Sequence, residues 1–112
     1  MKLPNAQLAI VEEEKILDYL LNAAHPDNGG KAGFFLSLGF SRNGWQTLAT
    51  AFRKMAEHDS IAKSMASSHG RKYVLDGEME TPSGKTAQVR TVWIIDAGFN
   101  APRLVTAYPQ EQ

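Results

Sequence analysis

The sequence predicts an α+β fold, in which about three N-terminal helices pack on a C-terminal antiparallel meander of three strands, or of four. Apolar residues recur three or four positions apart over residues 1–63, which is typical of amphipathic helices. Over residues 71–109 the period changes to two, which is typical of strands. No repeat, low-complexity tract or linker divides the 112 residues, so we expect a single domain over residues 1–112.

The first helix is expected over about residues 12–22. Residues 3–6 (LPNA) are expected to form an extended lead-in. The glutamates at 12–14 would lie in the first turn, where they complement the helix dipole. The His25-Pro26 pair and the DNGG turn at 27–30 then end the helix.

Two more helices are expected before the strands. The second covers about residues 31–38 and ends at Gly39, which favours a left-handed backbone. The third begins after Ser41 or Asn43, either of which could cap it, and ends near residue 58. Its apolar stripe comprises Trp45, Leu48, Phe52 and Met55. The short polar residues at 60–69 are expected to form mostly a loop.

Three strands are expected, at residues 71–80, 86–96 and 103–109, joined by the turns TPSGK and AGFNAP. The second is apolar on both faces after Arg90, which predicts a central position in the sheet. Strict alternation in the last strand would place Arg103, Val105 and Ala107 on one face and Leu104, Thr106 and Tyr108 on the other. Because both faces carry apolar residues, the pattern leaves open which face meets the helices.

The composition restricts the function classes. The 12 basic and 12 acidic residues balance, and neither half of the chain is basic overall, which disfavours extensive contact with nucleic-acid phosphates but allows a local cluster. The absence of cysteine excludes disulfides and thiolate metal sites. No apolar run reaches the roughly 18 residues of a membrane helix, and the acidic N-terminal segment is unlike a signal peptide. We therefore expect a cytoplasmic protein that contacts no membrane.

Two residues of the segment HPDNGGK (25–31) are candidates for chemistry. His25 either caps the end of the first helix as a cation or acts as a general acid or base, since histidine titrates near neutral pH. Lys31 would open the second helix, where the dipole disfavours a cation. It is therefore either a neutral feature of an exposed turn or a contact for an anion such as phosphate. The three histidines lack zinc-motif spacing, and no dinucleotide or nucleophile-elbow signature occurs, so we expect no metal and no cofactor.

The strands carry the remaining candidates, in two groups. The first group comprises Arg90, Thr91, Arg103, Thr106 and Tyr108. As a cross-strand group these side chains would resemble a phosphate-handling surface, and the alternative is that they are ordinary sheet-surface residues. The second group, Arg71 and Lys72, belongs to the dense basic patch HGRK, which is either a phosphate contact or a solvated strand entrance.

Several motifs cover nearly the whole chain: LPNA at residues 3–6, Lys15-x-x-x-Tyr19, His25-Pro26, GGKA at 29–32, GKTAQVRTVWI at 84–94 and PRLVTAY at 102–108. In these residues the chain resembles a family of small bacterial domains of unknown function, which also occur as C-terminal modules of polymorphic and contact-dependent toxins. The layout of those domains is similar to the barnase, EndoU, colicin and RelE-like ribonuclease fold. Carried over by position, the resemblance marks His25, Lys31, Arg90, Thr91, Thr106 and Tyr108.

The leading hypothesis is a metal-independent ribonuclease-like toxin domain that cleaves RNA by attack of the 2′-hydroxyl on the adjacent phosphate. The expected catalytic residues are His25 as acid–base, Lys31 and Arg90 as phosphate stabilisers, and Thr106 and Tyr108 as positioning or proton-shuttling groups. The expected substrate-binding residues are Arg71, Lys72, Thr91 and Arg103. The partners would be RNA and a cognate antitoxin or immunity protein. The alternative is a non-catalytic protein-binding module of a small bacterial or phage system, which the balanced charge favours and in which these residues are structural.

Overall fold

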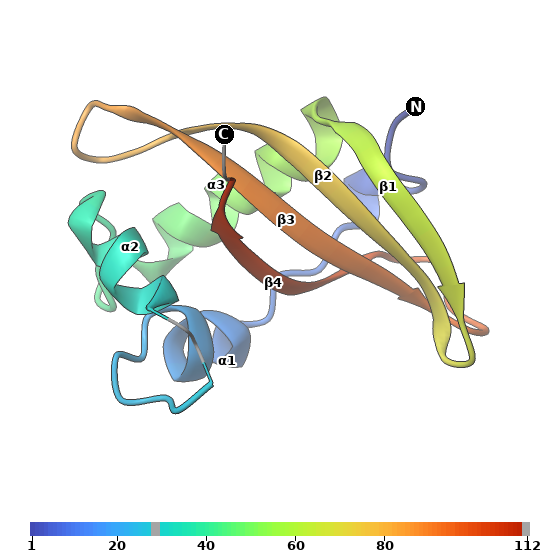
Figure 1. The fold of residues 1–112 in the computed structure, drawn as a ribbon, viewed down its shortest axis with the longest axis horizontal. Helices are drawn as coiled ribbons and strands as arrows, with labels where there is room; N and C mark the ends of the chain where they lie inside the picture. Colours follow the sequence, from blue (N-terminus) through green and yellow to red (C-terminus); the bar gives the residue numbers. More distant parts are fainter. Residues whose placement is uncertain (28–29, 111–112) are drawn as a thin grey trace.

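The computed structural model describes residues 1–27 and 30–110 and confirms the α+β class (Figure 1). The helices come first, and an antiparallel sheet of strand order β1-β2-β3-β4 follows. The strands are β1 (Ser60–Ser67), β2 (Gly70–Glu80), β3 (Thr86–Asp96) and β4 (Arg103–Pro109). The predicted DNGG turn contains residues 28 and 29, which lie outside the described residues. None of the described helices is long and apolar enough to cross a membrane.

The first helix differs from the prediction in both length and geometry. The chain forms a 3₁₀ turn, η1 (Ala6–Leu8), where an extended lead-in was expected. The helix expected over residues 12–22 is a short α-helical turn, α1 (Glu13–Lys15), continued by a π-helical segment, η2 (Ile16–Leu20). The wide turn is closed by the Leu21 amide, which donates to the Ile16 carbonyl at 2.7 Å. It brings Ile16, Leu20 and Leu21, four and five positions apart, into the core together.

The positions of the other two helices agree with the prediction, but the N-cap residue of the third is Gly44 and not Ser41 or Asn43. Helix α2 covers Lys31–Ser37, and Gly39 follows it with a φ of 97°, which favours glycine. Helix α3 covers Trp45–His58, and its fully buried face comprises Leu48, Ala49, Phe52, Met55 and Ala56. The Ser41 hydroxyl accepts a hydrogen bond from the Gly44 amide at 3.1 Å, just before α3 begins. Figure 1 shows α3 crossing behind the sheet, while α1 and α2 lie beside β4.

The prediction of a loop at residues 60–69 is wrong, because most of this segment forms β1. This strand has almost no buried side chain, so its sequence shows no alternation of apolar and polar residues. It is held by its antiparallel pairing with β2, with Ser67 opposite Gly70 at the hairpin end. The hairpin requires glycine at position 70, since a Cβ atom there would collide with the backbone of Ile95. The four-stranded alternative is therefore the correct one.

The strand register settles which sheet face meets the helices. Val89, Thr91 and Trp93 of β3 point toward α3 and are fully buried. Arg90 lies on the opposite face, which we call the outer face. In β4, a bulge between the pairs Val92↔Thr106 and Trp93↔Leu104 changes the alternation. As a result Leu104 and Ala107 both enter the core, and the outer face carries Arg103, Thr106 and Tyr108. The face assignment expected for this strand is therefore wrong.

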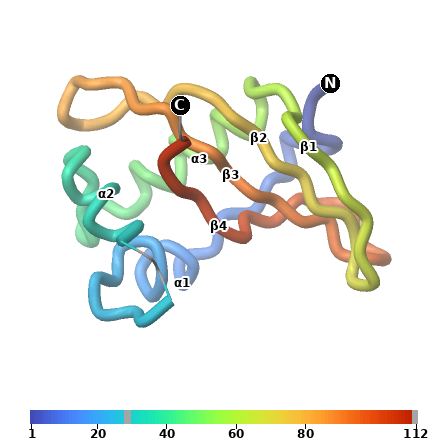
Figure 2. Tube along the Cα trace, in the orientation of Figure 1, coloured from blue at the N-terminus to red at the C-terminus, as the bar shows by residue number. Residues whose placement is uncertain are grey.

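The N-terminal segment, drawn in blue in Figure 2, contacts both edges of the sheet. The Met1 carbonyl accepts a hydrogen bond from the Ile61 amide of β1 at 2.8 Å. Farther along, the Ile10 amide donates to the Pro102 carbonyl at 2.8 Å, and the Leu104 amide of β4 donates to the Ile10 carbonyl at 3.0 Å. These bonds satisfy part of the backbone of each edge strand.

Candidate functional site

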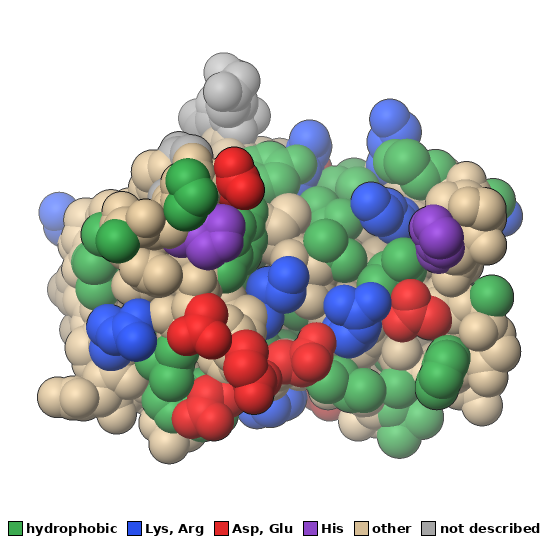
Figure 3. Space-filling model, turned by 90° about the horizontal axis from the view of Figure 1, so that it is seen from below, with side chains coloured by type: hydrophobic (Ala, Val, Ile, Leu, Met, Phe, Trp, Pro, Cys, Tyr) green, Lys and Arg blue, Asp and Glu red, His purple; other side chains and the backbone are tan. Residues whose placement is uncertain are grey.

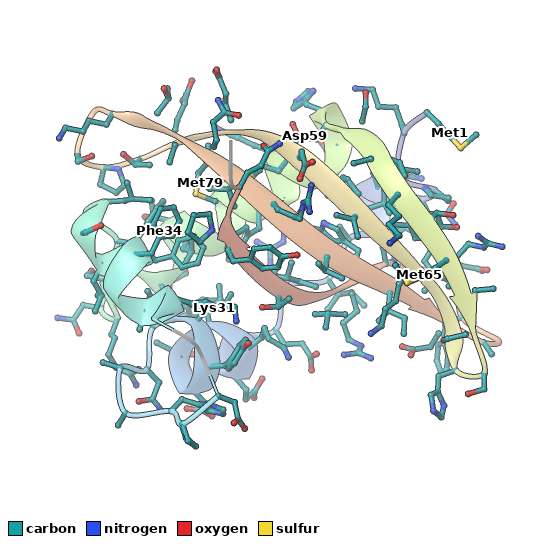
Figure 4. All side chains as sticks on the ribbon, viewed as in Figure 1. Met1, Lys31, Phe34, Asp59, Met65 and Met79 are labelled. Carbon is teal, nitrogen blue, oxygen red and sulfur yellow. The ribbon has the colours of Figure 1, made fainter. Side chains whose placement is uncertain are left out.

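Lys31 lies between two tyrosine rings that come from distant parts of the chain. Its Nζ atom is 5.4 Å from the centroid of the Tyr19 ring and 5.9 Å from that of the Tyr108 ring. Tyr19 belongs to η2 and Tyr108 to β4, and Lys31, labelled in Figure 4, is the first residue of α2. Ring faces attract cations at these distances, so the two tyrosines hold the ammonium group without neutralising its charge.

Tyr19 is the hub of this arrangement. The Nζ atom of Lys15 lies 5.3 Å from its ring centroid, and its hydroxyl lies 3.4 Å from Thr106 Oγ1 of β4. Burial raises the pKa of the Tyr19 hydroxyl, but hydrogen bonds with Thr106 and Lys31 and the positive charges of Lys31 and Lys15 outweigh burial. The net pKa of Tyr19 is lowered from its ordinary value of 10.0. Lowering this pKa increases the fraction of phenolate available at neutral pH.

His25 also contacts the Tyr19 ring. The rings of His25 and Tyr19 meet edge to face, with centroids 5.0 Å apart and planes at 80°. The Nδ1 atom of His25 accepts a hydrogen bond from the Asp27 amide at 3.1 Å. Because Nδ1 is the acceptor, the hydrogen of the neutral ring lies on Nε2.

Arg90 extends the site across the outer face. It lies opposite Tyr108 in the β3–β4 register and opposite Asp76 in the β2–β3 register. The Asp76 carboxylate accepts two bonds from Arg90, at 2.6 Å from Nε and 2.8 Å from Nη2. The hydrogen bonds and charge of Asp76, with a smaller contribution from the Tyr108 hydroxyl, raise the pKa of Arg90. A small cavity of about 190 Å³ adjoins this pair and is lined by Arg90, Tyr108, Pro109 and Gln110.

We call Tyr19, His25, Lys31, Thr106 and Tyr108 the tyrosine–lysine cluster. They come from η2, the turn after it, α2 and β4, and Arg90 adjoins the cluster through Tyr108. Figure 3 views the molecule from below, on the side of α1, and shows acidic side chains interspersed with basic ones. This face of the molecule is therefore not uniformly basic, in agreement with the balanced composition.

All four of the expected substrate-binding residues lie outside the cluster. Thr91 is fully buried on the α3 side of the sheet, where its hydroxyl accepts a 2.9 Å hydrogen bond from Trp93 Nε1. Its side chain is therefore enclosed in the core, away from the outer face. Arg71 lies on the β1–β2 hairpin and donates to the Ser64 hydroxyl at 2.8 Å.

Lys72 and Arg103 lie on the outer face, one on each side of Ile94 in the strand register. Ile94 is four residues beyond Arg90, which corresponds to roughly 13 Å along a strand. Arg103 pairs with Asp96 at 3.2 Å and more weakly with Glu12 at 3.9 Å. These two basic residues could therefore meet only an extended ligand that also reaches Arg90.

Two residues of the site were not identified from the sequence, Tyr19 of the cluster and Asp76, which pairs with Arg90. The available signal for Tyr19 was the spacing Lys15-x-x-x-Tyr19, which puts an ammonium group and the ring one helical turn apart. For Asp76 no local signal exists, because its partner is fixed by the register of two strands. No group of three or more histidine, aspartate or glutamate side chains within residues 1–27 and 30–110 is arranged to hold a metal ion.

Comparison with known proteins identifies a family and a solved structure of similar fold. The model of the family described as "Domain of unknown function (DUF6883)" matches residues 2–111. No curated protein matches. A chain in the solved structure "Contact-dependent growth inhibition toxin - immunity protein complex from Klebsiella pneumoniae 342" has a similar fold, with a TM-score of 0.74 and 21% sequence identity. The similarity covers 96% of this chain and 97% of the other, so it extends over the whole fold.

Proposed function

We propose that this chain, which belongs to the family of domains of unknown function DUF6883, is a metal-independent ribonuclease-like toxin domain acting on RNA in the cytoplasm of a target cell. The observation that carries the proposal is the convergence of Tyr19, Lys31 and Tyr108, with His25 and Arg90 adjoining, from segments far apart in the sequence. The fold shared with a chain of a toxin–immunity complex supports the toxin context.

The proposed chemistry is the attack of an RNA 2′-hydroxyl on the adjacent phosphorus, with departure of the 5′-oxygen. The products carry a 2′,3′-cyclic phosphate and a 5′-hydroxyl. This reaction needs a base for the 2′-hydroxyl proton, a donor for the leaving oxygen and cations for the charged phosphate. A positioned acid or base contributes roughly 10²–10⁴-fold to such a rate.

Each of these roles has a candidate in or beside the cluster. Lys31 and Arg90 would stabilise the phosphate, since both present cationic groups beside Tyr108. Tyr19 is our candidate for the base, because its pKa is lowered and its hydroxyl meets Thr106. His25 would protonate the leaving oxygen from Nε2 as an imidazolium and end as the neutral ring with its proton on Nδ1, which requires the hydrogen bond from the Asp27 amide to be given up. Thr106 and Tyr108 would position the substrate or relay a proton.

A second candidate function is a non-catalytic binding module of the same kind of system, such as the protein that neutralises a toxin. The specific observation in its favour is that Arg90 is held bidentately by Asp76, so the guanidinium group has a structural partner. Under this function the cluster stabilises the contact of η2 and α2 with β4. Removing its charges would then weaken binding of the protein partner and change no RNA cleavage.

Expression in bacteria tests the proposal. The wild type is expected to slow growth and fragment cellular RNA, and the Lys31→Ala/Arg90→Ala variant to restore both. The matched control is Arg53→Ala/Lys85→Ala, which removes the same charges from exposed positions away from the cluster and should remain toxic. Intact RNA and normal growth with a folded wild type, shown by circular dichroism of the purified protein, would exclude the nuclease function and leave the binding module.

A further inference from the structure

A groove on the helical side of the sheet shares no residue with the tyrosine–lysine cluster. It runs along α3 and is closed on its other side by the end of β2 and the following turn. Its volume of about 670 Å³ lies within the roughly 300–1,000 Å³ of typical ligand pockets. The groove is therefore large enough to hold a side chain together with part of the segment that carries it.

The lining of the groove combines an apolar floor with an excess of negative charge. Met55 of α3 and Met79 of β2 belong to this floor, and methionine adapts to varied ligand shapes. The charged lining comprises the carboxylates Asp59, Glu78 and Glu80 against the cation Lys54 and the imidazole of His58. An anionic ligand such as phosphate would be repelled here, whereas a cation would be attracted.

Asp59 marks one end of the groove and carries an unsatisfied oxygen. Its Oδ2 atom is buried and has no hydrogen-bond partner among the described residues. The carboxylate lies so close to the backbone of Gly77 that a Cβ atom there would overlap it. Asp59 and Met79 are labelled in Figure 4, where they come from the end of α3 and from β2. A buried carboxylate oxygen without a partner is costly, and a nearby cation would reduce that cost.

The position of Asp59 at the C-terminal end of α3 adds to this preference. The Asp59 amide donates to the Met55 carbonyl at 2.9 Å, and carbonyl groups at this end of a helix favour cations. The chain already shows the effect, because the Lys2 ammonium group donates a hydrogen bond to the His58 carbonyl. Lys2 also contributes positive charge near Asp59.

We propose that this groove binds a basic side chain, arginine or lysine, of a protein partner, with its charged group at Asp59 and its methylene stem over Met55 and Met79. Charge complementarity selects the cation, and the apolar floor selects a long aliphatic stem over a compact inorganic ion. The groove and the tyrosine–lysine cluster are formed by different residues, so this inference does not depend on the proposed function.

The test uses acetyl-arginine-amide as the probe and acetyl-citrulline-amide as its neutral isostere, each titrated into the full chain and followed by NMR. We expect the arginine probe to give saturable shifts of the Asp59, Gly77 and Met79 signals with a millimolar dissociation constant, and the citrulline probe to bind at least about tenfold more weakly. Asp59→Asn should weaken arginine binding by a similar factor, while Lys2→Met should leave it unchanged or tighten it, since Lys2 competes for the same end of α3.

Three results would overturn the proposal. Equal shifts with citrulline would show that charge is not recognised, and unchanged binding by Asp59→Asn would remove the carboxylate from the site. Tighter binding of putrescine than of the arginine probe would assign the groove to a free amine instead of a protein side chain. The folded state of each variant is read from the same spectra, so a misfolded variant is recognised directly.

Discussion

Replacing Asp59 with asparagine is expected to stabilise the protein at neutral and alkaline pH. Burial is the largest cause that raises the pKa of Asp59, from 3.8 to about 6; Lys2 and His58 oppose this, and Asp76 adds to it. The folded state thus holds the Asp59 proton up to about pH 6, whereas the unfolded chain releases it near pH 4. In that window the folded state binds more protons, so stability falls as pH rises, and the full penalty is present above pH 6.

The size of the effect follows from the pKa difference. Two pKa units correspond to about 3 kcal/mol at most. Because the Asp59 side chain stays partly exposed, solvent screening reduces this to roughly 1 kcal/mol. Asparagine keeps the shape of the side chain and cannot ionise. The variant should therefore exceed the wild type by about 1 kcal/mol at pH 8 and by almost nothing at pH 4.

Urea denaturation at pH 4, 5, 6, 7 and 8 measures this difference directly. The matched control is Asp18→Asn, an exposed aspartate whose replacement should change stability by less than about 0.5 kcal/mol at every pH. An Asp59→Asn variant that is less stable than the wild type at pH 8, or a stability difference that does not change with pH, would contradict a destabilising charge on Asp59 in the folded state.

Three further predictions concern the core and the cluster. Thr91→Val removes the acceptor of the buried Trp93 Nε1 at constant shape and should cost roughly 1–3 kcal/mol in urea denaturation; unchanged stability would contradict the described hydrogen bond. Lys31→Met should raise the pKa of Tyr19, followed by phenolate absorbance and assigned with Tyr19→Phe, because a hydrogen bond and a positive charge are lost; a lowered pKa would show that Lys31 is not what depresses it. Arg90→Lys should lose RNA cleavage as fully as Arg90→Ala, because a lysine ammonium group cannot keep the bidentate contact with Asp76 that orients the side chain at position 90. Full activity of Arg90→Lys would show that a positive charge alone suffices.

Much of the fold could be predicted, because most elements have a regular apolar pattern that matches their buried residues. Helices α2 and α3 bury one apolar face, and strands β2, β3 and β4 carry apolar residues where they meet the core. Strand β1 could not, since it is stabilised by backbone pairing and buries almost no side chain. Its sequence, SIAKSMAS, mixes polar, small and apolar residues without a regular alternation of apolar and polar positions. The turn of η2 was hidden for a related reason: α- and π-helical turns place apolar residues at overlapping spacings.

The candidate site was only partly accessible from the sequence. Lys31 was singled out because a cation at the start of a helix is unfavourable, and the structure gives it two ring faces as neighbours. The bulge in β4 reversed the expected faces, because one inserted residue changes every later side-chain direction. The Arg90–Asp76 pair depends on strand register, and the contact of Asp59 with Gly77 joins residues from separate elements. Neither contact can be predicted from the residues next to it in the sequence.

Under the proposed function, the tyrosine–lysine cluster and Arg90 cleave RNA by attack of the 2′-hydroxyl on the adjacent phosphate. The most direct test is cleavage of a labelled RNA by the purified chain in the presence of EDTA, with analysis of the new ends. We predict fragments with a 2′,3′-cyclic phosphate and a 5′-hydroxyl, no cleavage at a nucleotide carrying a 2′-deoxy substitution, and a rate at least about a hundredfold lower for Lys31→Ala/Arg90→Ala. No cleavage by the folded wild type, or equal cleavage by that variant, would contradict the claim.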